Sequence, residues 1–274
     1  MKSDSPWLHR YAIFVAVGAL IAIAAGAIVT SLERPIATNA AVSINPAFEF
    51  WHSIAGSVAV VLVLGLAIGF RAQFGWIALV AGLVDAVLGA RAITNALPQL
   101  SGILHALLAQ VFFGCIVAIA VITSASWKRG PEPIEDTWHP SMRSLSFAVP
   151  AIILLQTTLG ASYRYRALGV IWHILNAMIV LLLILVVAVF LIRQFPQHPT
   201  LRPVAVTLAV ITSIQVMLGF TTFMMLILFP ETSLAVVITS VLHVTTGALT
   251  FGAGLALAML IRYNVRGQRS LTGQ

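Results

Sequence analysis

The fold of this chain is decided by stretches such as residues 168–192, LGVIWHILNAMIVLLLILVVAVFLI, which contain no charged residue. A helix rises about 1.5 Å per residue, so a run of this length crosses the roughly 30 Å hydrocarbon core of a bilayer. Such runs dominate the composition: 60% of the 274 residues are hydrophobic, 8% are charged, and the mean hydropathy is +1.02. Because a soluble domain carries about 25% charged residues, these values exclude a soluble globular protein.

Eight apolar runs predict an all-α integral membrane protein with eight transmembrane helices. The first run is too long for the apolar segment of a signal peptide, so we expect it to remain in the protein. The end of the seventh run, residues 223–229, fits an interfacial turn as well as a helix. The predicted spans are residues 11–31, 50–70, 74–91, 102–126, 145–163, 168–192, 203–229 and 234–261.

The basic residues predict the orientation of these spans. An even number of spans places both termini on one side, and 11 of the 15 Lys and Arg residues fall on that side. Positive charge accumulates in cytoplasmic loops, so we expect a cell-membrane protein with both termini in the cytoplasm. These loops explain the net charge of +7, and contact with lipid rather than nucleic acid is expected. The basic residues on the outer side are Arg34, Arg91, Arg164 and Arg166.

A polar stretch at residues 126–144 divides the chain into two halves of four spans, residues 1–130 and 131–274. Both halves begin on the cytoplasmic side, so the predicted relation is a parallel pseudo-repeat of two four-helix bundles. A polar residue three positions before Leu-Gly recurs late in three odd-numbered spans, which favours a repeat. The copies are Asp85-Ala-Val-Leu-Gly89, Gln156-Thr-Thr-Leu-Gly160 and Gln215-Val-Met-Leu-Gly219.

Four of the seven histidines lie near the starts of the even-numbered spans. Those spans all run inward from the outer side, so the four imidazoles are expected at one depth near the outer face. A small residue follows each histidine one turn further in, which leaves a gap on the same helix face. The four pairs are His52 with Gly56, His105 with Ala109, His173 with Ala177, and His243 with Gly247.

This pattern predicts two bis-histidine heme sites, one in each half. Imidazoles from facing helices of a four-helix bundle hold heme iron from both sides, and the small residues leave room for the flat macrocycle. A single histidine near a helix end is more often an interfacial polar group, but ionisable residues within membrane spans are rare and mostly functional. Zinc is the rival metal, although neither the single cysteine, Cys115, nor a third nearby histidine completes a tetrahedral site.

Charged residues supply further candidates. Arginines on the outer side run against the positive-inside rule, and their guanidinium groups suit either heme propionates or lipid headgroups. Glu49 precedes His52 by one turn and fits a role in orienting the imidazole, in accepting a proton, in contacting a heme substituent, or only as a favourable acid at a helix start. Asp85 is expected in the middle of the membrane. It is either a protonated carboxyl group packed against a neighbouring residue or a group that relays protons. The arginines are Arg91, Arg164 and Arg166.

The motifs and their order resemble those of the heme A synthase family over residues 11–262. The family has Arg after the first of these histidines, where this chain has Ser53, and the first outer loop lacks the cysteine pair found in some members. The stretch from Leu88-Gly89 to His105 is also similar to the family. The resemblance is carried mainly by Glu49-x-x-His52, by Gln156-x-x-Leu-Gly160 before Trp172-His173, and by His243-x-x-x-Gly247.

The resemblance implies an oxidoreductase that converts heme O to heme A by oxidising the C8 methyl group to a formyl group, for cytochrome oxidase assembly. It implies that His52 and His105 bind heme O as substrate and that Glu49 takes part in catalysis. It also implies that His173 and His243 bind heme b as cofactor. A heme O synthase, an electron donor and a second copy of the chain are the partners it suggests.

The residues leave two other functions open. A diheme b-type membrane cytochrome would transfer electrons without altering its hemes, and a heme carrier or assembly factor would only deliver heme. The matched depth of the four histidines is atypical of electron transfer across the bilayer, but it permits transfer between hemes on one side. Ser53 in place of the family's arginine suits a carrier.

Overall fold

The structure, a computed structural model, describes residues 6–33, 46–69, 73–94, 98–136 and 141–266. Within these ranges eight helices are long and apolar enough to cross a membrane. The prediction of an all-α, multi-pass membrane protein is therefore confirmed. The eight helices are α1 (Pro6–Glu33), α2 (Pro46–Leu64), α3 (Gln73–Thr94), α4 (Pro98–Ile122), α6 (Met142–Arg164), α7 (Val170–Gln194), α8 (Leu201–Leu228) and α9 (Leu234–Asn264).

Several helix ends differ from the apolar runs that predicted them. α1 begins at Pro6 rather than at residue 11, because adding a residue to a helix that is already formed is easy even where the sequence becomes more polar. α8 continues to Leu228, so the alternative of a turn at residues 223–229 is not adopted. α4 instead ends early, at Ile122, and Ser124 then caps the short helix α5 (Ala125–Lys128).

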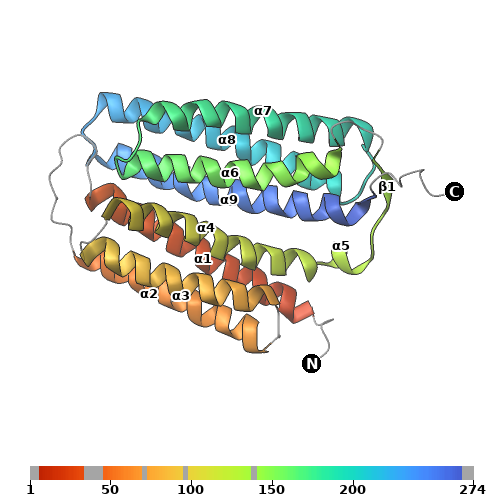
Figure 1. Cartoon of the computed structure of the whole chain (residues 1–274), viewed down its shortest axis with the longest axis horizontal. Helices are drawn as coiled ribbons and strands as arrows, with labels where there is room; N and C mark the ends of the chain where they lie inside the picture. Colours follow the sequence, from red (N-terminus) through yellow and green to blue (C-terminus); the bar gives the residue numbers. More distant parts are fainter. Residues whose placement is uncertain (1–5, 34–45, 70–72, 95–97, 137–140, 267–274) are drawn as a thin grey trace.

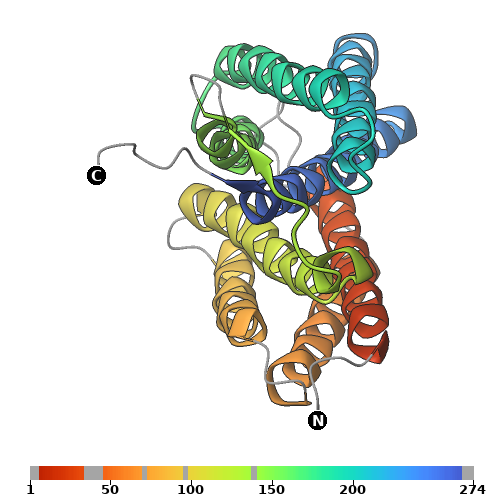
Figure 2. The ribbon, with the colours of Figure 1, turned by 90° about the vertical axis from the view of Figure 1, so that its right-hand side faces the viewer.

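The helices form two bundles that lie side by side, α1–α4 and α6–α9 (Figures 1 and 2). α9 lies at the boundary and contacts α1 and α4 of one bundle as well as α6 and α8 of its own. The buried hydrophobic residues form two clusters, one built mainly from α6–α9 and one from α1–α4 together with Ala248 of α9. Each bundle therefore has its own packed interior, and α9 belongs partly to both.

A reciprocal contact joins α4 to α9 across this boundary. A Cβ atom added to Gly114 would lie 2.7 Å from Cε1 of Phe251, and one added to Gly252 would lie 2.9 Å from Cε1 of Phe113. Each phenyl ring therefore packs on the glycine of the opposite helix. Small residues allow this kind of close approach between helices in lipid, where dispersion contacts replace the hydrophobic effect as the source of attraction.

The described part of the polar segment between the bundles pairs with the end of α9. Strand β1 (Ile134–Glu135) forms a parallel pair with β2 (Val265–Arg266), which directly follows α9. Trp127 of α5 stacks on Tyr263 of α9 with ring centroids 4.0 Å apart. The sequence predicted only a polar connection here, because strands of two residues leave no periodic pattern.

A turn of π-helix at Gly65–Gly69 follows α2. The hydroxyl of Tyr11 donates a hydrogen bond of 2.9 Å to the carbonyl of Leu62, just before this turn. A Cβ atom added to Gly75, near the start of α3, would lie 2.9 Å from the backbone of Ala67. Glycine at this position therefore lets α3 return close against the end of the preceding span.

Candidate functional site

The structure brings the four predicted histidines together as two pairs, one in each bundle. The rings of His52 in α2 and His105 in α4 have centroids 6.1 Å apart and planes at 82°. The rings of His173 in α7 and His243 in α9 also have centroids 6.1 Å apart, with planes at 83°. The two pairs thus share one separation and one mutual orientation.

Each histidine lies against a glycine of the preceding transmembrane helix. A Cβ atom added to any of these glycines would lie closer to the imidazole than an ordinary van der Waals contact allows. Glycine therefore permits the close approach of ring and backbone that defines each site. The distances from the added Cβ to Cε1 are 2.8 Å for Gly26 and His52, 3.0 Å for Gly89 and His105, 2.9 Å for Gly160 and His173, and 2.9 Å for Gly219 and His243.

The Nδ1 atom of each histidine faces a backbone carbonyl one turn before that glycine. A carbonyl can only accept a hydrogen bond, so Nδ1 carries the proton in each bonded ring and Nε2 keeps the lone pair that binds a metal. His243 approaches the carbonyl of Gln215 without reaching hydrogen-bond geometry to any described residue. The three hydrogen bonds are from His52 to Ala22 at 3.1 Å, from His105 to Asp85 at 3.1 Å, and from His173 to Gln156 at 3.2 Å.

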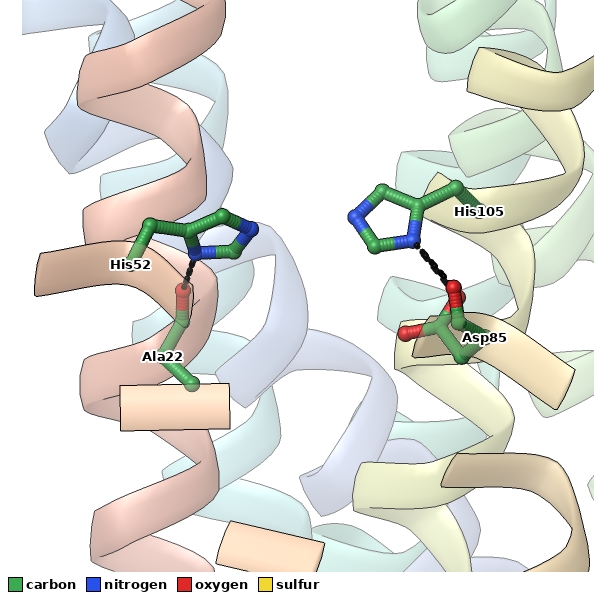
Figure 3. Close-up of polar contacts among 4 residues, drawn as sticks. All are labelled: Ala22, His52, Asp85 and His105. Atoms are coloured by element: carbon green, nitrogen blue, oxygen red, sulfur yellow. Dashed lines mark hydrogen bonds and ion pairs between the residues drawn. The ribbon is translucent and has the colours of Figure 1, made fainter. Parts of the chain in front are cut away.

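The pair in the N-terminal bundle is drawn in Figure 3. Nδ1 of His52 is turned toward Ala22 and Nδ1 of His105 toward Asp85, while the other nitrogen of each ring points toward the opposite histidine. The side chain of Asp85 adds a second contact, because its Oδ1 lies 2.9 Å from Nδ1 of His105. The sequence left the role of Asp85 open, and the structure brings its carboxylate against an imidazole.

The pair in the C-terminal bundle has an amide in place of that carboxylate. Gln156 donates to the backbone carbonyl of His173 at 3.0 Å, and its Oε1 accepts from Asn176 at 2.8 Å. Nε2 of the same amide lies 3.0 Å from Nδ1 and 3.2 Å from Nε2 of the His173 ring. These contacts hold the ring of His173 and the start of α7 against α6.

The two glycines predicted to form gaps one turn below a histidine have different surroundings. A Cβ atom added to Gly56 would meet no described atom within 4 Å, so the space below His52 is open there. A Cβ atom added to Gly247 would lie 3.2 Å from Nε2 of Gln215, so that amide fills the space below His243. The predicted gap is therefore present at Gly56 and occupied by a side chain at Gly247.

The candidate arginines lie at or just beyond the ends of helices. Arg164 ends α6, and its guanidinium donates to the carbonyl of Thr30 in α1 and interacts electrostatically with Glu231. Arg164 therefore links the two bundles. Arg166 lies in the following connection with a positive φ of 60°. Arg91 lies in α3, but its side chain is outside the described residues.

Glu49, the candidate catalytic residue, lies in the first turn of α2, one turn before His52. Its side chain is half-buried. A carboxylate in this position adds favourable charge at a helix start, and it stands on the same helix as one of the paired imidazoles. This position is compatible with both the structural role and the chemical roles predicted for Glu49.

The donor set of each bundle is two facing imidazoles. A metal bound at about 2 Å by one nitrogen of each ring would place the ring centroids roughly 6 Å apart, close to the 6.1 Å of both pairs. Within the described part of the chain, no three or more His, Cys, Asp or Glu side chains are grouped around one metal position. The chain matches no protein-family model, and no curated protein matches it significantly.

Proposed function

We propose that each histidine pair binds one heme and that the chain is a heme A synthase-type oxidoreductase of the cell membrane. One observation carries the heme sites: two pairs in two bundles have the same 6.1 Å separation and nearly the same interplanar angle. Independent interfacial histidines would have no reason to adopt matched geometry. The activity is inferred from the resemblance of the motifs around these histidines to that family.

The residues present fit a bis-histidine heme on three grounds. In the rings of His52 and His105, hydrogen bonds from Nδ1 to backbone carbonyls leave the lone pair of Nε2 directed toward the opposite histidine. Nδ1 of His173 makes the same kind of bond, and its Nε2 lies 3.2 Å from the amide of Gln156. Each ring lies beside a glycine, and a Cβ atom at that position would displace the ring. The open space at Gly56 lies one turn from His52, on the same helix face.

The two sites are assigned different tasks in this proposal. His52 and His105, in residues 1–130, hold heme O as substrate, and His173 and His243, in residues 131–274, hold heme b as cofactor. Bound heme b supplies one-electron redox chemistry, which the protein tunes through the ligands and their hydrogen bonds. Glu49 accepts a proton near the substrate, and Arg91 and Arg166 are the guanidinium groups proposed for the propionates.

The position of the sites fits a reaction near the outer face of the membrane. With both termini in the cytoplasm, the starts of α2, α4, α7 and α9 lie on the outer side, and every paired histidine is within the first ten residues of its helix. A heme O synthase would supply the substrate, and an electron donor would serve the heme b site.

A diheme b-type cytochrome is the second candidate, and the near identity of the two pairs favours it. A substrate site and a cofactor site have different tasks, whereas two electron-carrying hemes can share one geometry. A cytochrome of this kind would hold unmodified heme b in both bundles. A heme carrier would instead release its heme to added apoprotein.

Heme extraction from the expressed protein tests these functions. The chain is produced in cells that also make heme O, and the extracted pigments are separated by chromatography with mass detection. Heme A, or its hydroxylated intermediate, is expected, and Glu49→Gln is expected to abolish both products while two hemes per chain remain. Heme b alone, despite abundant heme O, would contradict the enzyme and support the cytochrome. A protein without heme would overturn the histidine sites themselves.

A further inference from the structure

The four histidines share one backbone setting but differ in one side chain. In each case the residue whose carbonyl faces Nδ1 lies four positions before the glycine that faces the ring. Only one of the four such residues is ionisable. They are Ala22, Asp85, Gln156 and Gln215, and the pairs are therefore alike in geometry and different in charge.

The carboxylate of Asp85 is directed at one imidazole. Its Oδ1 lies 2.9 Å from Nδ1 of His105, and the two side chains are only 15% and 23% exposed. Oδ1 is buried, and no described residue, His105 included, donates to it in hydrogen-bond geometry. The imidazole N–H therefore donates to the backbone carbonyl of Asp85, and the carboxylate lies beside it at ion-pair distance.

The corresponding position beside His243 carries no charge. Gln215 lies four residues before Gly219, as Asp85 lies before Gly89. Its Nε2 is directed to the space below Gly247, and its Oε1 has no hydrogen-bond partner in the described ranges. The amide therefore offers His243 nothing equivalent to the carboxylate at His105.

We infer that Asp85 is a positioning residue that makes the iron site of the N-terminal bundle the one of lower reduction potential. A carboxylate held against the outer N–H of a ligating imidazole stabilises positive charge on the ring and makes it a stronger ligand. A stronger donor, together with a buried negative charge nearby, stabilises ferric iron more than ferrous iron. This inference rests on the proposed heme sites and adds that the two are electrochemically different.

A potentiometric titration of the purified full chain, followed by heme absorbance, tests the inference. Asp85→Asn keeps the shape of the side chain and removes its charge. We expect it to raise one of the two midpoint potentials and leave the other unchanged, and Asp85→Glu to restore much of the original value. A tenfold change in the relative affinity for ferric and ferrous iron would shift the midpoint by about 59 mV.

The matched variant is Gln215→Asp, which introduces a carboxylate at the corresponding place beside His243. It is expected to lower the midpoint that Asp85→Asn leaves unchanged. If Asp85→Asn loses heme from its site, Gln215→Asp alone decides the question, and an unchanged midpoint in that variant overturns the inference. The inference is also overturned if Asp85→Asn keeps both hemes and neither midpoint potential changes. A wild-type protein without heme bands would instead overturn the proposed function on which it rests.

Discussion

The glycine beside each histidine has a more specific role than the sequence revealed. In the sequence, the recurring Leu-Gly motif with Gly89, Gly160 and Gly219 indicated only a repeat. In the structure each of these glycines lies against a paired imidazole. The fourth, Gly26, escaped notice because neither Leu nor a polar residue precedes it at the motif spacing. The separations along the chain between glycine and histidine are unequal, so no sequence pattern links them.

Gly26→Ala is expected to remove heme from the N-terminal bundle and to lower the heme content to about half, since the added Cβ would overpack the site. That Cβ would lie 2.8 Å from Cε1 of His52 and 3.3 Å from both of its ring nitrogens. Heme per chain is measured by the pyridine hemochrome absorbance of the purified protein.

Gly18→Ala, in the same helix, is the matched control. Its added Cβ would lie 3.7 Å from Cδ1 of Leu62, which is an ordinary contact. The control should keep the full heme content. Equal heme in Gly26→Ala and wild type would contradict the role assigned to Gly26.

Among the helices, α4 and α9 combine two tasks. Each carries one histidine of a pair and, eight residues later, the Phe of a Phe-Gly dipeptide that packs on the other helix. In α4 the residues are His105 and Phe113-Gly114, and in α9 they are His243 and Phe251-Gly252. α4 and α9 thus carry the same spacing of histidine, phenylalanine and glycine, and their contact connects the two histidine sites.

Overpacking this contact should destabilise the boundary between the bundles. Gly252→Ala places a Cβ 2.9 Å from Cε1 of Phe113, and such overpacking costs about 1 to 3 kcal/mol. Phe113→Leu in the same chain provides space for the new methyl group. The double variant should therefore be more stable than the sum of the single changes predicts.

The measurement is unfolding of the purified chain in mixed detergent micelles, for the wild type, both single variants and the double variant. Strictly additive changes in the free energy of unfolding would show that Phe113 and residue 252 do not interact. Gly56→Ala, whose added Cβ meets no described atom within 4 Å, provides a stability control for the glycine-to-alanine change itself.

The two bundles are joined at both ends of α6 as well as along α9. Before α6, the hydroxyl of Tyr263 in α9 donates a 2.9 Å hydrogen bond to the carbonyl of Trp127 in α5, beside the β1–β2 pair. At the end of α6, Arg164 donates to the carbonyl of Thr30. The positive-inside rule assigns the first of these ends to the cytoplasm and the second to the outer side.

Cysteine labelling tests this orientation in a Cys115→Ser background. Gln197, between α7 and α8, and Thr232, between α8 and α9, are exposed at opposite ends of α8. In spheroplasts, a membrane-impermeant maleimide should label Thr232→Cys directly and Gln197→Cys only after permeabilisation. The reverse pattern would invert the topology and place the histidine pairs near the cytoplasmic face.

The amino-acid order is sufficient to predict eight spans, their orientation, the division near residue 130 and the depth of the four histidines. The structure confirms the eight spans. All these predictions rest on the apolar content of local stretches and on charge counts, which need no knowledge of which helices touch. The pairing of His52 with His105, the glycine beside each ring, and the carboxylate of Asp85 at Nδ1 depend on contacts between distant segments. Close packing of helices creates those contacts, and no local pattern encodes the rotation of one helix against the next.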